Sequence, residues 1–150
     1  MSSDGSHIAI EEALAFIALN PHSFLLGQRA DGYPTAYAMM ARVADGAVEF
    51  STYRASAKVR NLLRNGHAGV VAAADADDDP RVLVAGGPVE LVEGEQWVRS
   101  DATVSMGKFA GARNVPAAIS DKVKSRHGDG KRAVIRVTLD RARFASKVTA

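Results

Sequence analysis

Residues 50–66 read FSTYRASAKVRNLLRNG, and this stretch decides how the rest of the chain is interpreted. It begins in an alternation of apolar and polar side chains that predicts a strand over residues 47–52. It continues as a short predicted helix over residues 57–65, with Ser56 as N-cap and Gly66 as a left-handed C-cap. The apolar positions of the helix repeat at i, i+3 and i+4, which predicts one buried stripe: Val59, Leu62 and Leu63.

The start of this helix carries an unusual charge. Lys58 falls in the first turn, Arg54 comes just before it, and no acidic residue occurs between Tyr53 and His67. A helix N-terminus carries partial positive charge, so acids are favoured there and a lysine slightly opposes helix formation. An anion removes this conflict, because backbone N–H groups, Ser56 and Lys58 would converge on one phosphate. The alternative is that the basic side chains only solvate an exposed helix.

Outside this segment, strand patterns alternate with turn signals. Ala30-Asp31-Gly32 and Asp45-Gly46 each predict a tight hairpin turn. Strands are predicted over residues 23–28, 35–43, 47–52, 68–74, 81–92 and 132–139. Helices are predicted over residues 8–19, 57–65, 95–103 and 116–126. Gly86-Gly87-Pro88 predicts a bulge or bend within the fifth strand.

These elements predict a mainly β fold. Six strands joined mostly as hairpins form an antiparallel sheet, and a sheet with such a bend curls into a small barrel with short helices at the connections. The length of 150 residues suits a single domain over residues 1–150.

The composition of the chain and the distribution of its charges disfavour several classes of function. The chain has no cysteine, which excludes thiolate chemistry, and the first twelve residues lack a basic leader, so the cytoplasm is the expected compartment. The net charge of +2 hides a segregation: residues 53–67 carry four basic side chains and no acid, whereas residues 68–95 carry seven acids and one arginine. This pattern favours local anion sites over a continuous nucleic-acid track. No histidine pair has metal-ligand spacing, so no metal site is predicted.

The segment 50–66, preceded by DGYPTAYAMMARVADGAVEF, resembles the pyridoxamine-5′-phosphate-oxidase-like split-barrel family. It is similar in particular to the small flavin- or deazaflavin-dependent oxidoreductases of that family. The features that carry the resemblance are Asp31-Gly32-x-Pro34, Ser51-Thr52, Ser56-x-Lys58 and Arg60-Asn61-Leu62. The chain departs from the common family pattern at Ala38, Met39 and Met40, which leaves the identity of the cofactor open.

The resemblance implies a homodimer of six-stranded split β-barrels that binds FMN or the deazaflavin coenzyme F-420 between subunits. By position, Ser51 and Thr52 would line the cofactor, Ser56 and Lys58 would hold its phosphate, and Asn61 would assist. The strand segment 35–39 would lie beside the ring system. Pyridoxamine phosphate oxidation itself is not expected, because the residues that bind the substrate phosphate in those longer enzymes are not found.

The leading functional hypothesis is an oxidoreductase that transfers hydride between a flavin or deazaflavin and a small organic acceptor. Its catalytic residue is unknown, with Tyr37, Tyr53 and solvent all candidates for the proton donor. The alternative is a carrier or sensor that binds the cofactor without turnover. A third reading, an oligonucleotide-binding barrel, is disfavoured because aromatic side chains are scarce in the basic segments.

Overall fold

A computed structural model describes residues 7–92 and 131–148. The described helices are α1 (Ile10–Leu19) and α2 (Ala57–Asn65). The described strands are β1 (His22–Gln28), β2 (Pro34–Met40), β3 (Arg42–Ala44), β4 (Ala47–Tyr53), β5 (His67–Ala73), β6 (Arg81–Val92), β7 (Arg132–Val137) and β8 (Arg141–Ser146). The helices predicted over 95–103 and 116–126 lie outside these residues, and the single domain over 1–150 stays a prediction.

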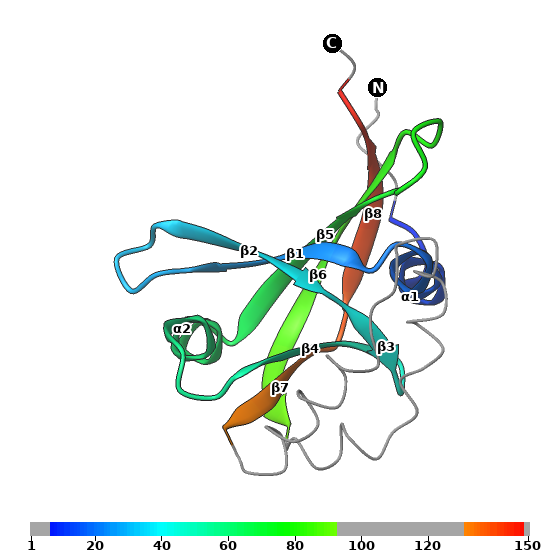
Figure 1. Ribbon diagram of the computed structural model, residues 1–150. Helices are drawn as coiled ribbons and strands as arrows, with labels where there is room; N and C mark the ends of the chain where they lie inside the picture. The colour runs from blue at the N-terminus through cyan, green and yellow to red at the C-terminus, as the bar shows by residue number, and fades with distance from the viewer. Residues whose placement is uncertain (1–6, 93–130, 149–150) are drawn as a thin grey trace.

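The strands form one curled antiparallel sheet in the order β2-β1-β5-β6-β7-β4-β3, with β8 paired to β6. Figure 1 shows the sheet wrapping around a common interior, with α1 and α2 at opposite sides of it. The prediction of a mainly β, antiparallel split barrel is confirmed.

The number of strands is higher than the predicted six. The segment 35–43 changes partner at Ala41, so that β2 pairs with β1 while β3 pairs with β4. The break is fixed by the backbone N–H of Ala41, which donates to the carbonyl of Pro21 at 2.8 Å. The last strand, β8, was not predicted, because its sequence RARFAS interleaves exposed arginines with few apolar residues.

Gly86-Gly87-Pro88, where a bulge or bend was predicted, pairs with β5 without an extra residue, and β6 changes partners directly after it. Up to Pro88 the strand pairs with β5, and from Val89 it pairs with β7. A Cβ atom on Gly87 would overlap the carbonyl oxygen of Thr138, so the β7–β8 connection can cross here only over a glycine. The single strand β6 thereby joins the two halves of the barrel.

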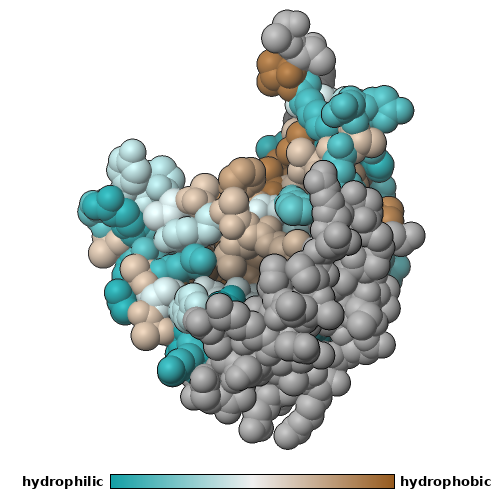
Figure 2. Space-filling view, viewed as in Figure 1, coloured by the Kyte–Doolittle hydropathy of each residue, from teal (hydrophilic) through white to brown (hydrophobic). Residues whose placement is uncertain are grey.

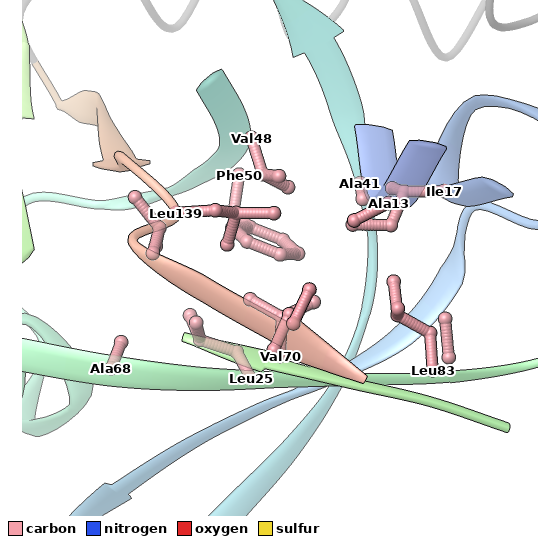
Figure 3. Close-up of a cluster of buried hydrophobic side chains, with 14 of the residues drawn as sticks. Ala13, Ile17, Leu25, Ala41, Val48, Phe50, Ala68, Val70, Leu83 and Leu139 are labelled. Atoms are coloured by element: carbon pink, nitrogen blue, oxygen red, sulfur yellow. The ribbon is translucent and has the colours of Figure 1, made fainter. Parts of the chain in front are cut away.

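The core fills the interior of the curled sheet. Figure 3 shows side chains from α1 and from several strands meeting there, among them Ile17, Leu25 and Phe50. These three are fully buried, as is Leu62 of α2, so both helices are attached to the barrel through apolar contacts. Within the described residues, neither helix is long and apolar enough to span a membrane.

Candidate functional site

The helix α2 begins and ends as its sequence predicts. The Ser56 hydroxyl accepts a hydrogen bond from the backbone N–H of Val59 at 3.2 Å, and Gly66 adopts φ +75°. The helix packs closely on β1, since a Cβ added to Gly27 would lie 3.0 Å from a methyl carbon of Leu62. The N-terminal turn of α2 is therefore held in place from both its cap and its buried face.

Lys58 projects from this first turn toward β2. Its ammonium nitrogen lies 5.1 Å from the centre of the Tyr37 ring, and the side chain is half-buried. Partial burial lowers the pKa of Lys58, Tyr37 opposes this effect, and the nearby positive charge of Arg132 lowers the pKa further. No carboxylate among the described residues forms an ion pair with Lys58.

Arg132 comes from β7, at the opposite end of the sequence. It is paired in register with Tyr53 of β4, and its guanidinium carbon lies 4.6 Å from the centre of the Tyr53 ring. Its Nε donates to the Ser51 hydroxyl at 3.0 Å, and its Nη2 donates to the Ser51 carbonyl at 3.1 Å. Arg132 thus places a positive charge beside Ser51, and the same charge acts on Lys58. Lys58 and Arg132 are here called the cation pair.

The two predicted cofactor-lining residues face opposite sides of β4. Thr52 is 3% exposed and lies on the same face as Phe50, toward the core, whereas Ser51 lies on the face that carries Arg132. We expect any contact of Thr52 with a ligand beside Ser51 to come from its backbone.

Asn61 lies one turn beyond Lys58, but its side chain is engaged along the helix. Its Oδ1 accepts a hydrogen bond from Arg64 Nη2 at 2.6 Å, and the same Nη2 donates to the carbonyl of Gln28 at 3.2 Å. Arg60 is exposed and donates to the carbonyl of Ala55, at 3.4 Å. Of the predicted site residues, Ser56 and Lys58 lie together at the start of α2, and Ser51 contacts Arg132. The Thr52 side chain faces the core, and that of Asn61 contacts Arg64.

Sequence reasoning missed Arg132 as a site residue. The contact between Arg132 and Ser51 spans 81 positions of sequence. The only available signal was the excess of basic residues near the C-terminal end, which does not say which of them reaches the site.

A second group of charges is centred on β4 and β7, further along the strands from Ser51 and Arg132. Glu49 of β4 lies between Arg42 of β3, at 3.3 Å, and Arg136 of β7, at 2.6 Å. Arg136 in turn lies 3.7 Å from Glu90 of β6. These four residues, here called the charge ladder, occupy paired positions across four neighbouring strands. Because the signs alternate, the ladder is a structural element of the sheet.

The outer face of β1 and β2 exposes apolar side chains. Phe24, 50% exposed, pairs across the strands with exposed Ala38, and Ala36 follows on the same face. Figure 2 shows this apolar surface over the middle of the sheet, between the polar tip of the β1–β2 hairpin and the polar β5–β6 loop.

The comparisons with known proteins agree with this architecture. The family model for pyridoxamine 5′-phosphate oxidase matches residues 9–146, so the chain belongs to this family. No curated protein sequence matches the chain significantly.

Several solved structures share the fold at low sequence identity. A conserved hypothetical protein of Mycobacterium tuberculosis is 22% identical, with a TM-score of 0.71, covering 97% of this chain and 89% of that protein. An F-420 reductase is 21% identical, with a TM-score of 0.60, covering 85% and 93% of the two chains. A heme-binding protein of Mycobacterium smegmatis is 17% identical, with a TM-score of 0.62, covering 97% of this chain and 57% of that protein. These likenesses establish the fold.

Proposed function

We propose that this protein binds a flavin or deazaflavin through its phosphate and transfers hydride between that cofactor and a small organic acceptor. The observation that carries the proposal is the half-buried ammonium of Lys58, which makes no ion pair with a carboxylate of the described residues and lies in the first turn of a helix without acids. A desolvated cation without a counter-ion is stabilised by a bound anion.

The donor groups fit a phosphate. The Ser56 hydroxyl accepts from Val59 and retains its own proton to donate, and Lys58 supplies the charge. Ser51 and the Thr52 backbone would contact the cofactor from β4, and Asn61 would assist through its amide nitrogen. On β2, the hydroxyl of Thr35 is buried with no hydrogen-bond partner in the described part of the chain, which suits a polar edge of the ring system.

The bound cofactor would supply the hydride chemistry, and the chain would supply binding, orientation and exclusion of water. Tyr37 lies on the same face of β2 as Thr35, with the Lys58 ammonium above its ring. Tyr37 and Tyr53 both remain candidates for the proton donor, and the catalytic residue is not assigned.

We also propose a homodimer, with the apolar outer face of β1 and β2 against the partner copy. Phe24 at 50% exposure is a large apolar side chain that association would remove from water. A dimer mass by light scattering in the wild type, and a monomer mass in Phe24→Glu, are the expected results. A monomeric wild type would contradict this assembly.

Of the two cofactors, F-420 has the support of one structural neighbour, which is an F-420 reductase. The absence of cysteine accords with a cytoplasmic redox enzyme. The alternative, a carrier or sensor, would bind the cofactor with similar affinity. It is distinguished by rapid mixing of the reduced complex with acceptors, where a carrier gives no acceleration over free cofactor.

Titration with FMN and with F-420, followed by fluorescence, tests the proposal. We expect binding of one of them, weakened at least about tenfold in Lys58→Ala, because a hydrogen bond to a charged group is lost. Arg60→Ala is the matched control, since it removes a positive charge from the exposed side of the same helix and should leave the affinity within about twofold. Equal affinity in the wild type and Lys58→Ala would contradict the assignment of the phosphate to Lys58.

A further inference from the structure

The cation pair joins two elements that the sequence keeps far apart. Lys58 comes from the first turn of α2, and Arg132 comes from the start of β7. The backbone N–H of Arg54 donates to the carbonyl of Lys131 at 3.0 Å, which ties the β4–α2 connection to the beginning of β7. The backbone pairing therefore brings the start of β7, with Arg132, to the connection that leads into α2.

Arg132 is held by contacts to β4, and no carboxylate of the described residues pairs with it. Ser51 accepts two hydrogen bonds from it, and the Tyr53 ring lies against its guanidinium. A guanidinium has five N–H donors, and the two hydrogen bonds to Ser51 use two of them. Among residues 7–92 and 131–148, no carboxylate forms an ion pair with Arg132.

Two neighbouring cations repel each other, and partial burial strengthens the repulsion. The lowered pKa of Lys58, caused first by burial and also by Arg132, reflects this cost. A phosphate placed between the two side chains would replace this repulsion with attraction, because both cations would then face negative oxygens. The planar guanidinium is suited to contact two of these oxygens at once.

We propose that Arg132 is a second phosphate-binding residue, and that with Lys58 and the Ser51 hydroxyl it forms an anion site which selects phosphorylated over unphosphorylated flavins or deazaflavins. The inference rests on the proposed function and adds to it a residue from β7 and a basis for selectivity. The shared ligand chemistry is a phosphate ester, which FMN carries at its end and F-420 carries within its tail.

The experiment measures the preference for the phosphate itself. FMN is compared with riboflavin, which has the same rings and no phosphate, and F-420 is compared with its deazaflavin chromophore without the tail. Each pair is titrated against the wild type, Arg132→Gln, Arg132→Lys and the control Arg60→Gln. The pair that shows a phosphate preference in the wild type identifies the source of the phosphate.

We expect Arg132→Gln to weaken binding of the phosphorylated member at least about tenfold and binding of the unphosphorylated member less than about twofold. Arg132→Lys keeps the charge but loses the paired contacts to Ser51, so an intermediate loss is expected. Arg60→Gln should change neither. Equal weakening of both members in Arg132→Gln would mean that Arg132 only positions β4, and no change in either would also overturn the proposal.

A second measurement separates this inference from the choice of cofactor. Inorganic phosphate, compared with chloride at equal ionic strength, should raise the melting temperature of the wild type and raise that of Arg132→Gln less. This outcome would uphold the anion site even if neither flavin nor deazaflavin bound. An equal effect of phosphate on both proteins, or no effect on either, would overturn it.

Discussion

The charge ladder and the cation pair both meet at β4 and β7, yet their charges are arranged in opposite ways. In the ladder, Glu49 lies between two arginines, and its side chain is 6% exposed. In the cation pair, the corresponding place on β4 holds Ser51, which binds Arg132 but brings no charge. Two residues along one strand thus separate a neutralised cluster from a positively charged one. The first arrangement stabilises the sheet, and the second is the one that we propose binds an anion.

The largest expected effect comes from breaking the ladder. Glu49→Ala leaves Arg42, 8% exposed, and Arg136 without their shared carboxylate, and removing one partner of a buried ion pair costs about 3–5 kcal/mol. Urea denaturation monitored by circular dichroism measures this loss.

Glu90→Gln is the control for that experiment, because it removes a carboxylate from the exposed end of the same ladder, at 66% exposure. The expected loss is below about 1 kcal/mol. Similar losses in both variants would show that burial does not distinguish the two carboxylates.

A second variant makes the cation pair resemble the ladder. Ser51→Asp places a carboxylate where the hydroxyl now lies 3.0 Å from Arg132 Nε, so it should raise the free energy of unfolding by up to about 1 kcal/mol. The same carboxylate repels an incoming phosphate, and we expect the affinity for the phosphorylated cofactor to fall at least about tenfold. Ser51→Asn, of the same shape and without charge, is the matched control. A stabilised Ser51→Asp protein that still binds the cofactor normally would separate Arg132 from the site.

The smallest effect is a dependence of stability on pH. Because the pKa of Lys58 is lowered from 10.5, the unfolded chain binds more protons than the folded chain between the lowered value and 10.5. The free energy of unfolding of the wild type, measured relative to Lys58→Met, should therefore rise with pH across this range. The rise should stay below about 1 kcal/mol, because the amine is only half-buried. Saturating phosphate should reverse the slope, since a bound anion raises the same pKa, and an unchanged slope would indicate that no anion contacts Lys58.

The sequence predicted those features of the fold that depend on residues close together in the chain. The caps of α2 follow from Ser56 and Gly66, and the hairpin turn at Asp45-Gly46 follows from two residues that tolerate positive φ. The change of partner at Ala41 was not predictable, because both flanking segments have the composition of one continuous strand. The strand β8 was missed because three of its six side chains are exposed, two of them arginines.

The sequence by itself determined where α2 begins and ends, and that a lysine lies in its first turn with no acid nearby. These are consequences of side chains a few positions apart, which local geometry brings together. Only the tertiary structure decided that Arg132 donates to Ser51, that Glu49 lies between two arginines, and that Ser51 and Thr52 face opposite sides of β4. Each of these depends on the pairing and register of strands distant in sequence, which the burial of the whole sheet sets and no short segment encodes.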